Sequence, residues 1–299
     1  KVVARVGLDY ASLKAVKPDV ILVTATAFGT SGPYADRPGF DTVAQAMSGA
    51  MSLTGFPDVP VRTVVPFADY GTALHAALGV TTALYHRSRT GEGRAIDVSL
   101  LATSLTFMHP FLCERAMTDR VRGQQGNRSF YTAPSNTYRT RDGWVMVPTV
   151  GEWMFGRWAE LVGRSEWIGN PRFADDLARA DHAEEIDEVT SAWCAERTTE
   201  EVVAGFQEAR LPAGPVYNLD EVLADPQVAA QGWLEHVAAP SDDTPVPLTR
   251  SPLAFADDTA AQRKPLSRAP RLGEHTDDVL AEVGFSIAEI GELRRESAV

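Results

Sequence analysis

The sequence is poor in cysteine, in positive charge and in long apolar runs. Its two cysteines, Cys113 and Cys194, are too few for a disulfide framework or a multi-cysteine zinc site, so we expect two buried thiols in a reducing compartment. The formal net charge of −12 argues against a nucleic-acid partner, which would require a basic face. No apolar run approaches the roughly 18 residues of a membrane-spanning helix, and no signal peptide opens the chain. These absences predict a cytoplasmic protein with no membrane partner.

Several familiar catalytic and binding motifs are also absent. The sequence contains no Walker P-loop, no G-x-G-x-x-G that opens a helix after a strand, no H-E-x-x-H and no G-x-S-x-G. Its six histidines show no metal-ligand spacing, so we expect no metal site. Gly91-Glu92-Gly93 precedes a predicted strand, so its glycines favour a hairpin-type turn over a phosphate-binding loop.

The composition is that of a folded protein with a sizeable core. The chain has 299 residues, of which 44% are hydrophobic and 23% charged. At roughly 150 residues per domain, this length suggests two domains. The first residue is Lys1 rather than Met, so we expect the chain to be a piece of a longer protein.

The first part of the chain alternates between strand and helix patterns. Residues 20–25 form an apolar run typical of a strand buried on both faces, and residues 95–100 predict another strand. Asp41 opens a helical pattern as its N-cap, and residues 61–65 suggest a further strand. Residues 73–86 are apolar nearly all round, which predicts a buried helix. The alternation indicates an α/β layer with parallel strands.

The composition changes after residue 115. Residues 116–139 are polar and rich in Gly, Gln, Asn and Ser, which is typical of a linker. A second pattern follows, with a strand at 144–147. Three helices are predicted after it, at residues 152–162, 182–196 and 199–209. Two capping boxes mark helix starts, one formed by Thr198 with Glu201 and the other by Ser286 with Glu289.

Asp69 is the strongest candidate for chemistry. It stands between a predicted strand end and the most apolar helix, where α/β enzymes place ligands and reactive groups. The free N–H groups and the dipole of a helix N-terminus favour an ionised carboxylate, which nucleophilic catalysis requires. An ordinary N-cap aspartate gives the same pattern, and periodicity does not separate the two roles.

The segment 36–41 is the second candidate. Arg37 can pair with a phosphate, and Gly39 lets a ligand approach the backbone closely. The alternative is a turn with a solvated Arg37 and a helix cap at Asp41.

A series of sequence blocks runs in one order along nearly the whole chain. The blocks are Gly7-Leu8-Asp9-Tyr10, Phe28-Gly29-x-Ser31-Gly32-Pro33-Tyr34, Arg37-Pro38-Gly39-Phe40-Asp41-x-x-Ala44-Gln45-Ala46-x-Ser48-Gly49, Pro66-x-Ala68-Asp69, Thr90-Gly91-Glu92-Gly93-Arg94 through Asp97-Val98-Ser99, and Ala269-Pro270-x-Leu272-Gly273-Glu274-His275-Thr276. In this order they closely resemble the class III CoA-transferase family, also called the CaiB/BaiF family.

The resemblance implies a catalytic role for Asp69, which corresponds to the nucleophilic Asp of the family's Pro-x-Ala-Asp block. This carboxylate is expected to attack the thioester of an acyl-CoA and then to carry CoA as an aspartyl-CoA thioester. A carboxylic acid acceptor reverses these steps and leaves as the new acyl-CoA. CoA is therefore expected as a substrate, with no permanently bound cofactor. We expect the backbone N–H groups near Asp69 to stabilise the oxyanions that form.

The Gly39-Phe40-Asp41 block is similar to a CoA-contacting segment of the family, which implies CoA contacts at Arg37, Gly39, Phe40 and Asp41. Relatives that racemise 2-methylacyl-CoA esters resemble this block but carry His before the Asp. Phe40 cannot carry a proton, so the sequence favours a transferase over a racemase.

Family members are interlocked homodimers with a large Rossmann-like domain formed from both chain ends and a smaller inserted domain. The resemblance therefore assigns residues 1–115 to the large domain of an α/β fold and 116–139 to a linker. It assigns residues 140–215 to a small α+β domain, and 216–299 to a second linker and a return to the large domain. The family's opening portion is absent before Lys1. A further hypothesis is therefore a truncated, non-catalytic chain that only dimerises or binds CoA.

Overall fold

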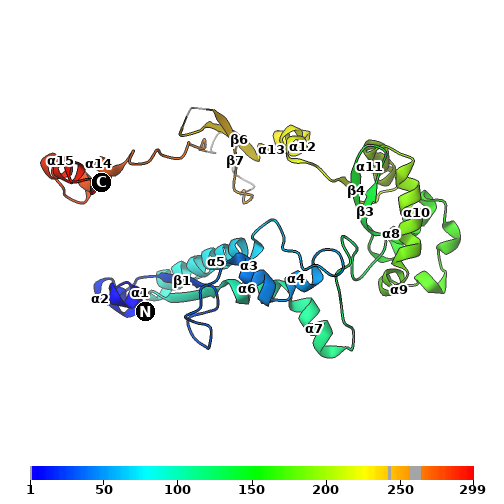
Figure 1. Cartoon of the computed structure of the whole chain (residues 1–299), viewed down its shortest axis with the longest axis horizontal. Helices are drawn as coiled ribbons and strands as arrows, with labels where there is room; N and C mark the ends of the chain where they lie inside the picture. Colours follow the sequence, from blue (N-terminus) through cyan, green and yellow to red (C-terminus); the bar gives the residue numbers. More distant parts are fainter. Residues whose placement is uncertain (1, 242–243, 256–263) are drawn as a thin grey trace. The chain divides into compact units, whose positions relative to one another are not determined.

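A computed structural model describes residues 2–241, 244–255 and 264–299 (Figure 1). The chain divides into two compact units, Lys1–Pro215 and Val216–Val299, and each is described by itself. The fold is mixed α/β.

A two-stranded parallel sheet lies at the centre of the first part of the chain. Strand β1 (Leu22–Thr26) pairs with β2 (Ala95–Ser99) in continuous register, from Leu22 beside Ala95 to Thr26 beside Ser99. The connection between them ends in the long helix α5 (Phe67–Thr90), which packs against both strands and against helix α6 (Leu100–Phe107). The prediction of parallel strands joined through a helix is confirmed.

The turn between α5 and β2 depends on its two glycines. Gly91 ends α5 with a φ of 75°, a left-handed conformation that glycine adopts without strain. A Cβ at Gly93 would lie 1.9 Å from the carbonyl oxygen of Val20. The Gly91-Glu92-Gly93 segment therefore joins a helix to a parallel strand and is not the hairpin-type turn that the sequence predicts. Its second glycine lets β2 approach the residues that precede β1.

The first part of the chain contains further helices. They are α1 (Val2–Arg5), α2 (Tyr10–Val16), α3 (Asp41–Met47), α4 (Ala50–Leu53) and α7 (His109–Met117). The helical pattern that opens at Asp41 is divided into α3 and α4, because Gly49 between them has a φ of 89°. Helices α6 and α7 are likewise separate, since α6 ends at Phe107 and Pro110 lies in the first turn of α7.

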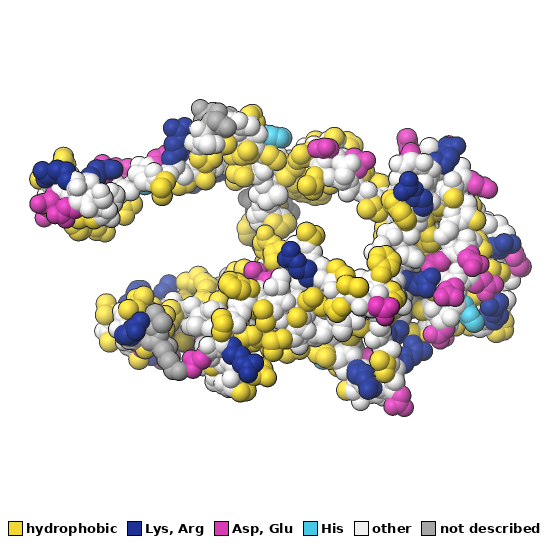
Figure 2. Space-filling view, in the orientation of Figure 1, with side chains coloured by type: hydrophobic (Ala, Val, Ile, Leu, Met, Phe, Trp, Pro, Cys, Tyr) yellow, Lys and Arg dark blue, Asp and Glu magenta, His cyan; other side chains and the backbone are white. Residues whose placement is uncertain are grey.

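Two expectations for this region are wrong. Residues 61–65 form no strand, and the backbone N–H of Thr63 donates to the side chain of Gln45 instead of to a neighbouring strand. Helix α5 is not buried on all sides, because Leu74, Leu78 and Tyr85 are 71%, 65% and 68% exposed. In the described part of this unit the sheet with α5 has two strands, so it covers one face of the helix and leaves the other open. Figure 2 shows many hydrophobic side chains at the surface of this part of the chain.

A hydrophobic core lies in residues 133–213. Strands β3 (Ser135–Arg139), β4 (Trp144–Pro148) and β5 (Gly214–Pro215) form an antiparallel sheet in that order. The surrounding helices are α8 (Gly151–Leu161), α9 (Asp176–Asp181), α10 (Ala183–Ala195) and α11 (Thr199–Glu208), with short 3₁₀ turns at Ser165–Trp167 and Pro171–Phe173. The core contains the fully buried Trp158 and Phe206, and the predicted capping box at Thr198 is present.

The predicted linker over 116–139 is only partly a linker. Its last residues form β3, and its polar side chains are anchored. The Gln124 amide donates to the carbonyl oxygens of Thr54 and Val59, at 3.1 and 2.7 Å. Arg128 pairs with the nearly buried carboxylate of Asp187 at 2.7 Å. The polar composition thus reflects specific hydrogen bonds as well as solvation.

The cysteines differ from each other. Cys194 is fully buried, as expected, but Cys113 on α7 is partly exposed, so the expectation is wrong for Cys113. The Sγ atom of Cys113 lies 3.5 Å from Nε2 of His109, one helical turn earlier.

The second unit contains helices α12 (Leu219–Ala224) and α13 (Pro226–Gln231), the antiparallel pair β6 (Leu234–Ala238) and β7 (Pro245–Thr249), and helices α14 (Thr276–Glu282) and α15 (Ile287–Arg295). Helix α15 starts at the predicted capping box of Ser286 and Glu289. Among the helices of the described ranges, none combines the length and the hydropathy that crossing a membrane requires.

Candidate functional site

Asp69 lies in the first turn of α5, and its side chain is exposed. The helix starts at Phe67 after Pro66, so Asp69 is the third helical residue and not the N-cap. Pro66 provides no side-chain cap. The ordinary N-cap role, which remained open from the sequence, is therefore excluded.

The cap of α5 comes from Asp41, the first residue of α3. Its Oδ1 accepts hydrogen bonds from the backbone N–H groups of Ala68 and Asp69, at 2.8 and 3.2 Å. The expectation that Asp41 caps its own helix is wrong, since Phe40 occupies the N-cap position of α3. Asp41 instead satisfies the first turn of another helix, which would otherwise have two unpaired donors.

Gln45 holds the other oxygen of Asp41. Its Nε2 donates to Oδ2 of Asp41 at 2.6 Å, and its Oε1 accepts from the backbone N–H of Thr63 at 3.0 Å. Asp41 and Gln45 are only 5% and 1% exposed. Sequence reasoning did not identify Gln45 as a site residue. The four-residue spacing from Asp41 on one helix face is the signal that could have found it.

The remaining N–H groups of the first turn of α5 also have acceptors. Phe67 donates to the carbonyl oxygen of Val65 at 2.9 Å, and Tyr70 donates to that of Pro66 at 3.1 Å. We expected free N–H groups near Asp69 that could bind an oxyanion. Residues 67–70 offer none in this structure, because each of these four donors is already paired.

The loop that joins β1 to α3 carries the other predicted site residues. The guanidinium of Arg37 lies 3.9 Å from the centre of the Tyr34 ring, and both side chains are exposed. Phe40 is 77% exposed. Gly39 packs tightly, since a Cβ there would lie 2.7 Å from Cβ of Ala27. The structure thus explains this glycine by close packing within the chain.

The structure brings Asp41 and Asp69 together, and Gly39 and Phe40 directly precede Asp41 in the chain. Within the described residues, no hydrogen bond or ion pair joins Arg37 to Asp69. The described ranges also contain no cluster of His, Cys, Asp and Glu side chains that could hold a metal ion.

The second turn of α5 is fixed against α6. Thr72 and Thr103 share a hydrogen bond of 2.9 Å between their hydroxyl groups. A Cβ at Gly71 would lie 2.6 Å from the ring of Phe107, so this glycine permits the close approach of the two helices. The two turns of α5 around Asp69 are therefore fixed by two contacts, with Asp41 at the first turn and with α6 at the second.

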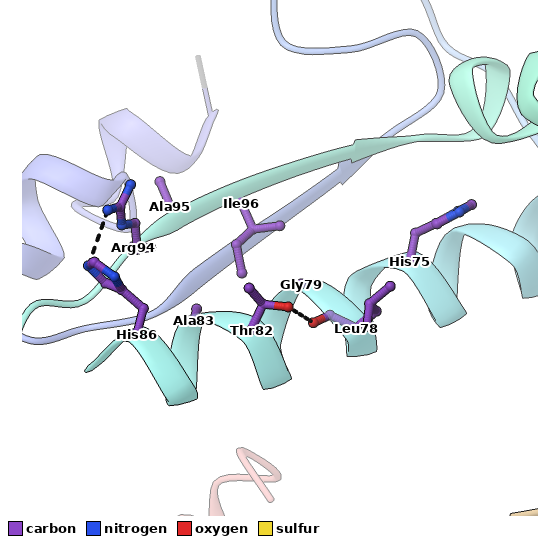
Figure 3. Close-up of a pocket in the computed structure, with 9 residues that line it drawn as sticks. All are labelled: His75, Leu78, Gly79, Thr82, Ala83, His86, Arg94, Ala95 and Ile96. Carbon is purple, nitrogen blue, oxygen red and sulfur yellow. Dashed lines mark hydrogen bonds between the residues drawn. The ribbon is translucent and has the colours of Figure 1, made fainter. Parts of the chain in front are cut away.

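A cavity of about 580 Å³ that is open to solvent lies farther along α5, beside β2 (Figure 3). Its lining includes His75, Leu78 and Ile96, together with Arg94 and His86, which share a hydrogen bond of 3.1 Å. Asp69 is not among the lining residues. The cavity is mostly apolar, and we assign no chemistry to it.

Comparisons with known proteins identify relatives over most of the chain. The sequence model of a family described as CoA-transferase family III matches residues 1–276. Succinyl-CoA–D-citramalate CoA-transferase of Chloroflexus aurantiacus is 35% identical over 227 residues, which cover 75% of this chain and 56% of that protein. Succinate–glutarate CoA-transferase of Agrobacterium fabrum is 32% identical over 281 residues, covering 94% and 69%. The chain thus spans little more than half the length of the first of these relatives.

The fold is also similar to a solved structure. The crystal structure of a CaiB/BaiF family protein from Brucella suis superposes with a TM-score of 0.75 at 32% sequence identity. The superposition covers 94% of this chain and 72% of that chain.

Proposed function

The chain belongs to CoA-transferase family III, and from this premise we propose that the whole protein moves CoA from an acyl-CoA donor to a carboxylic acid, with Asp69 as the nucleophile. The observation that carries the proposal is the position of Asp69. It is an exposed carboxylate in the first turn of a long helix whose start is held by hydrogen bonds.

The proposed reaction consists of two matched acyl exchanges. A carboxylate oxygen of Asp69 attacks the thioester carbonyl of the donor, the C–S bond breaks, and a mixed anhydride and CoA thiolate result. The thiolate then attacks the aspartyl carbonyl, which releases the donor acid as a carboxylate and leaves CoA on Asp69 as a thioester. The acceptor carboxylate repeats these steps in reverse order, and Asp69 is regenerated.

The N–H groups of the first turn of α5 are engaged, so other donors must stabilise the tetrahedral oxyanions. We propose that Arg37, Gly39 and Phe40 contact CoA. The exposed guanidinium of Arg37 and the exposed ring of Phe40 support this role.

Substrates are proposed from the names of the relatives. Both relatives described above act on succinyl-CoA or succinate together with a second organic acid. Succinyl-CoA is therefore the first donor to test, against a panel of short dicarboxylic acids.

We further propose a homodimer with a Rossmann-like large domain, as the family resemblance implies. The exposed apolar side chains on α5 support a covering partner, because contiguous apolar surface favours association. Light scattering of the whole protein tests this part, and a monomer at micromolar concentration would contradict it.

The decisive experiment traps the proposed intermediate. The protein is incubated with succinyl-CoA and then with hydroxylamine, which converts an aspartyl thioester into a hydroxamate. Trypsin cleavage after Arg62 and Arg87 releases residues 63–87, in which Asp69 is the only acidic residue. Mass spectrometry should find the modification on this peptide.

The matching variants are Asp69→Ala and, as a control, Asp119→Ala at another exposed carboxylate. We expect Asp69→Ala to lose transfer and trapping while it still binds CoA, and Asp119→Ala to keep both activities. Substantial turnover by Asp69→Ala would overturn the role of Asp69.

The racemase hypothesis is tested in parallel with a 2-methylacyl-CoA in deuterated water. Phe40 cannot exchange a proton, so we expect no deuterium at the α-carbon. Deuterium uptake without CoA transfer would favour the racemase instead.

A further inference from the structure

The hydrogen bonds of Asp41 all remain within the protein. Its carboxylate receives the N–H groups of Ala68 and Asp69 on one oxygen and the amide of Gln45 on the other. The residue is almost completely buried. A ligand would have to displace these partners to reach the carboxylate, so direct binding of CoA by this side chain does not account for its position.

The first turn of α5 depends on this carboxylate. A helix start leaves its first N–H groups without intrahelical partners, and such turns fray when no side chain caps them. Pro66 at the N-cap position supplies no cap. Asp41 therefore provides the side-chain bonds that hold the backbone of Asp69 in helical geometry.

We infer that Asp41 is a positioning residue for the nucleophile, and that Gln45 orients Asp41. The inference rests on the proposed function, because it assumes that Asp69 attacks the thioester. A displacement of about 1 Å at a reacting group can cost about 100-fold in rate, so a frayed first turn slows the chemical step without weakening acyl-CoA binding.

Gln45 fixes which of its neighbours donates a hydrogen bond and which accepts one. Its amide nitrogen faces Asp41, and its amide oxygen faces the N–H of Thr63. In Asp41→Asn, the new amide group would face the amide group of Gln45, so two donors would meet. Turning Gln45 over moves the conflict to Thr63, whose N–H would then meet a donor. No orientation of the two amides satisfies every partner.

A second substitution restores the pattern. In the double variant Asp41→Asn with Gln45→Glu, the new carboxylate at position 45 accepts from the amide at position 41 and from the N–H of Thr63. The amide oxygen at position 41 can still accept from Ala68 and Asp69. The double variant thus rebuilds the same set of hydrogen bonds with the charge moved from position 41 to position 45.

The test compares kinetics of the whole protein with the single and double variants. We expect Asp41→Asn to lower kcat about 100-fold, with KM for the acyl-CoA unchanged within about threefold. The double variant should recover kcat to within about threefold of the parent. Asp175→Ala, which removes the side-chain N-cap of α9, is the control for a generic loss of helix capping and should leave kcat unchanged.

Hydrogen exchange provides a readout that does not require turnover. We expect faster exchange at the amides of Ala68 and Asp69 in Asp41→Asn, and parental rates in the double variant.

An unchanged kcat in Asp41→Asn, or a raised KM with kcat intact, would overturn the positioning role, the latter in favour of a CoA contact. A kcat that the double variant fails to recover would overturn the role of Gln45 in orienting Asp41. Failure of the proposed function gives a different result, because CoA transfer would then persist in the Asp69→Ala variant.

Discussion

The backbone N–H of Asp69 donates a hydrogen bond to the carboxylate of Asp41, which lies 28 positions earlier in the chain. This bond joins the start of α5 to the start of α3. A long helix thus takes its cap from another helix, and the geometry around Asp69 depends on the packing between the two.

The first prediction concerns the stability of this contact. Asp41→Ala removes the acceptor of two backbone N–H groups and of the Gln45 amide, and it leaves these donors unpaired in a site where two of the three hydrogen bonds are buried. We expect the free energy of unfolding to fall by about 3 kcal/mol, measured by urea denaturation. Asp175→Ala removes an exposed N-cap and should cost only about 1 kcal/mol. Equal losses in the two variants would contradict the structural account of Asp41.

The second prediction concerns acid stability. Burial raises the pKa of Asp176, but hydrogen bonds from Arg179, from the backbone N–H of Gly151 and from Thr132 outweigh it and hold the pKa below its ordinary value of 3.8. Because the folded pKa is the lower one, this stabilisation is complete above pH 3.8 and is lost as the pH falls through the folded value.

The measurement compares the thermal midpoint of the parent with that of Asp176→Asn across about pH 3 to 6. At the upper end the variant should melt at a lower temperature, because it leaves the buried Arg179 without its carboxylate partner. The difference should shrink toward the acid end. A difference that does not change with pH would show that ionisation of Asp176 does not contribute.

The third prediction concerns the two thiols. Burial raises the pKa of Cys194 to about 12, so it should stay protonated and unreactive in the native protein. Cys113 is partly exposed and should react with iodoacetamide at about pH 8. Mass spectrometry should find one labelled cysteine in the native protein and none in the native Cys113→Ser variant. Both thiols should react in urea. Native labelling of Cys194 would show that its part of the core opens readily.

Local sequence signals predicted the elements that depend on local chemistry. The capping boxes of Thr198 and Ser286 are present, and they could be predicted because each joins residues only three positions apart. The parallel strands were predicted because their apolar runs and the helix between them form one pattern. The cap on α5 was missed because its carboxylate comes from Asp41, outside the window in which a cap is normally sought.

The apolar composition of α5 also misled the prediction of its burial. Apolar side chains such as Leu74 and Leu78 allow a helix to be buried on every face, but the sequence of the helix does not identify the segments that would pack against each face. The predicted strand at 61–65 failed for a related reason. The backbone N–H of Thr63 donates to the side-chain oxygen of Gln45, and no pattern of alternating residues can reveal such a bond.

The last prediction concerns Gly39, which the sequence associated with ligand approach. A Cβ at this position would lie 2.7 Å from Cβ of Ala27 and 3.1 Å from the Phe28 ring, so Gly39→Ala must push the loop away from the end of β1. Asp41 follows two residues later, and its cap on α5 should shift with the loop. We therefore expect lower stability, by about 2 kcal/mol, together with faster amide exchange at Ala68. Gly123→Ala, where an added Cβ meets nothing within 4 Å, is the matched control and should leave both unchanged. If Gly39→Ala is as stable as the parent, the loop can yield without moving Asp41. The glycine would then be better explained by contact with a ligand than by packing against β1.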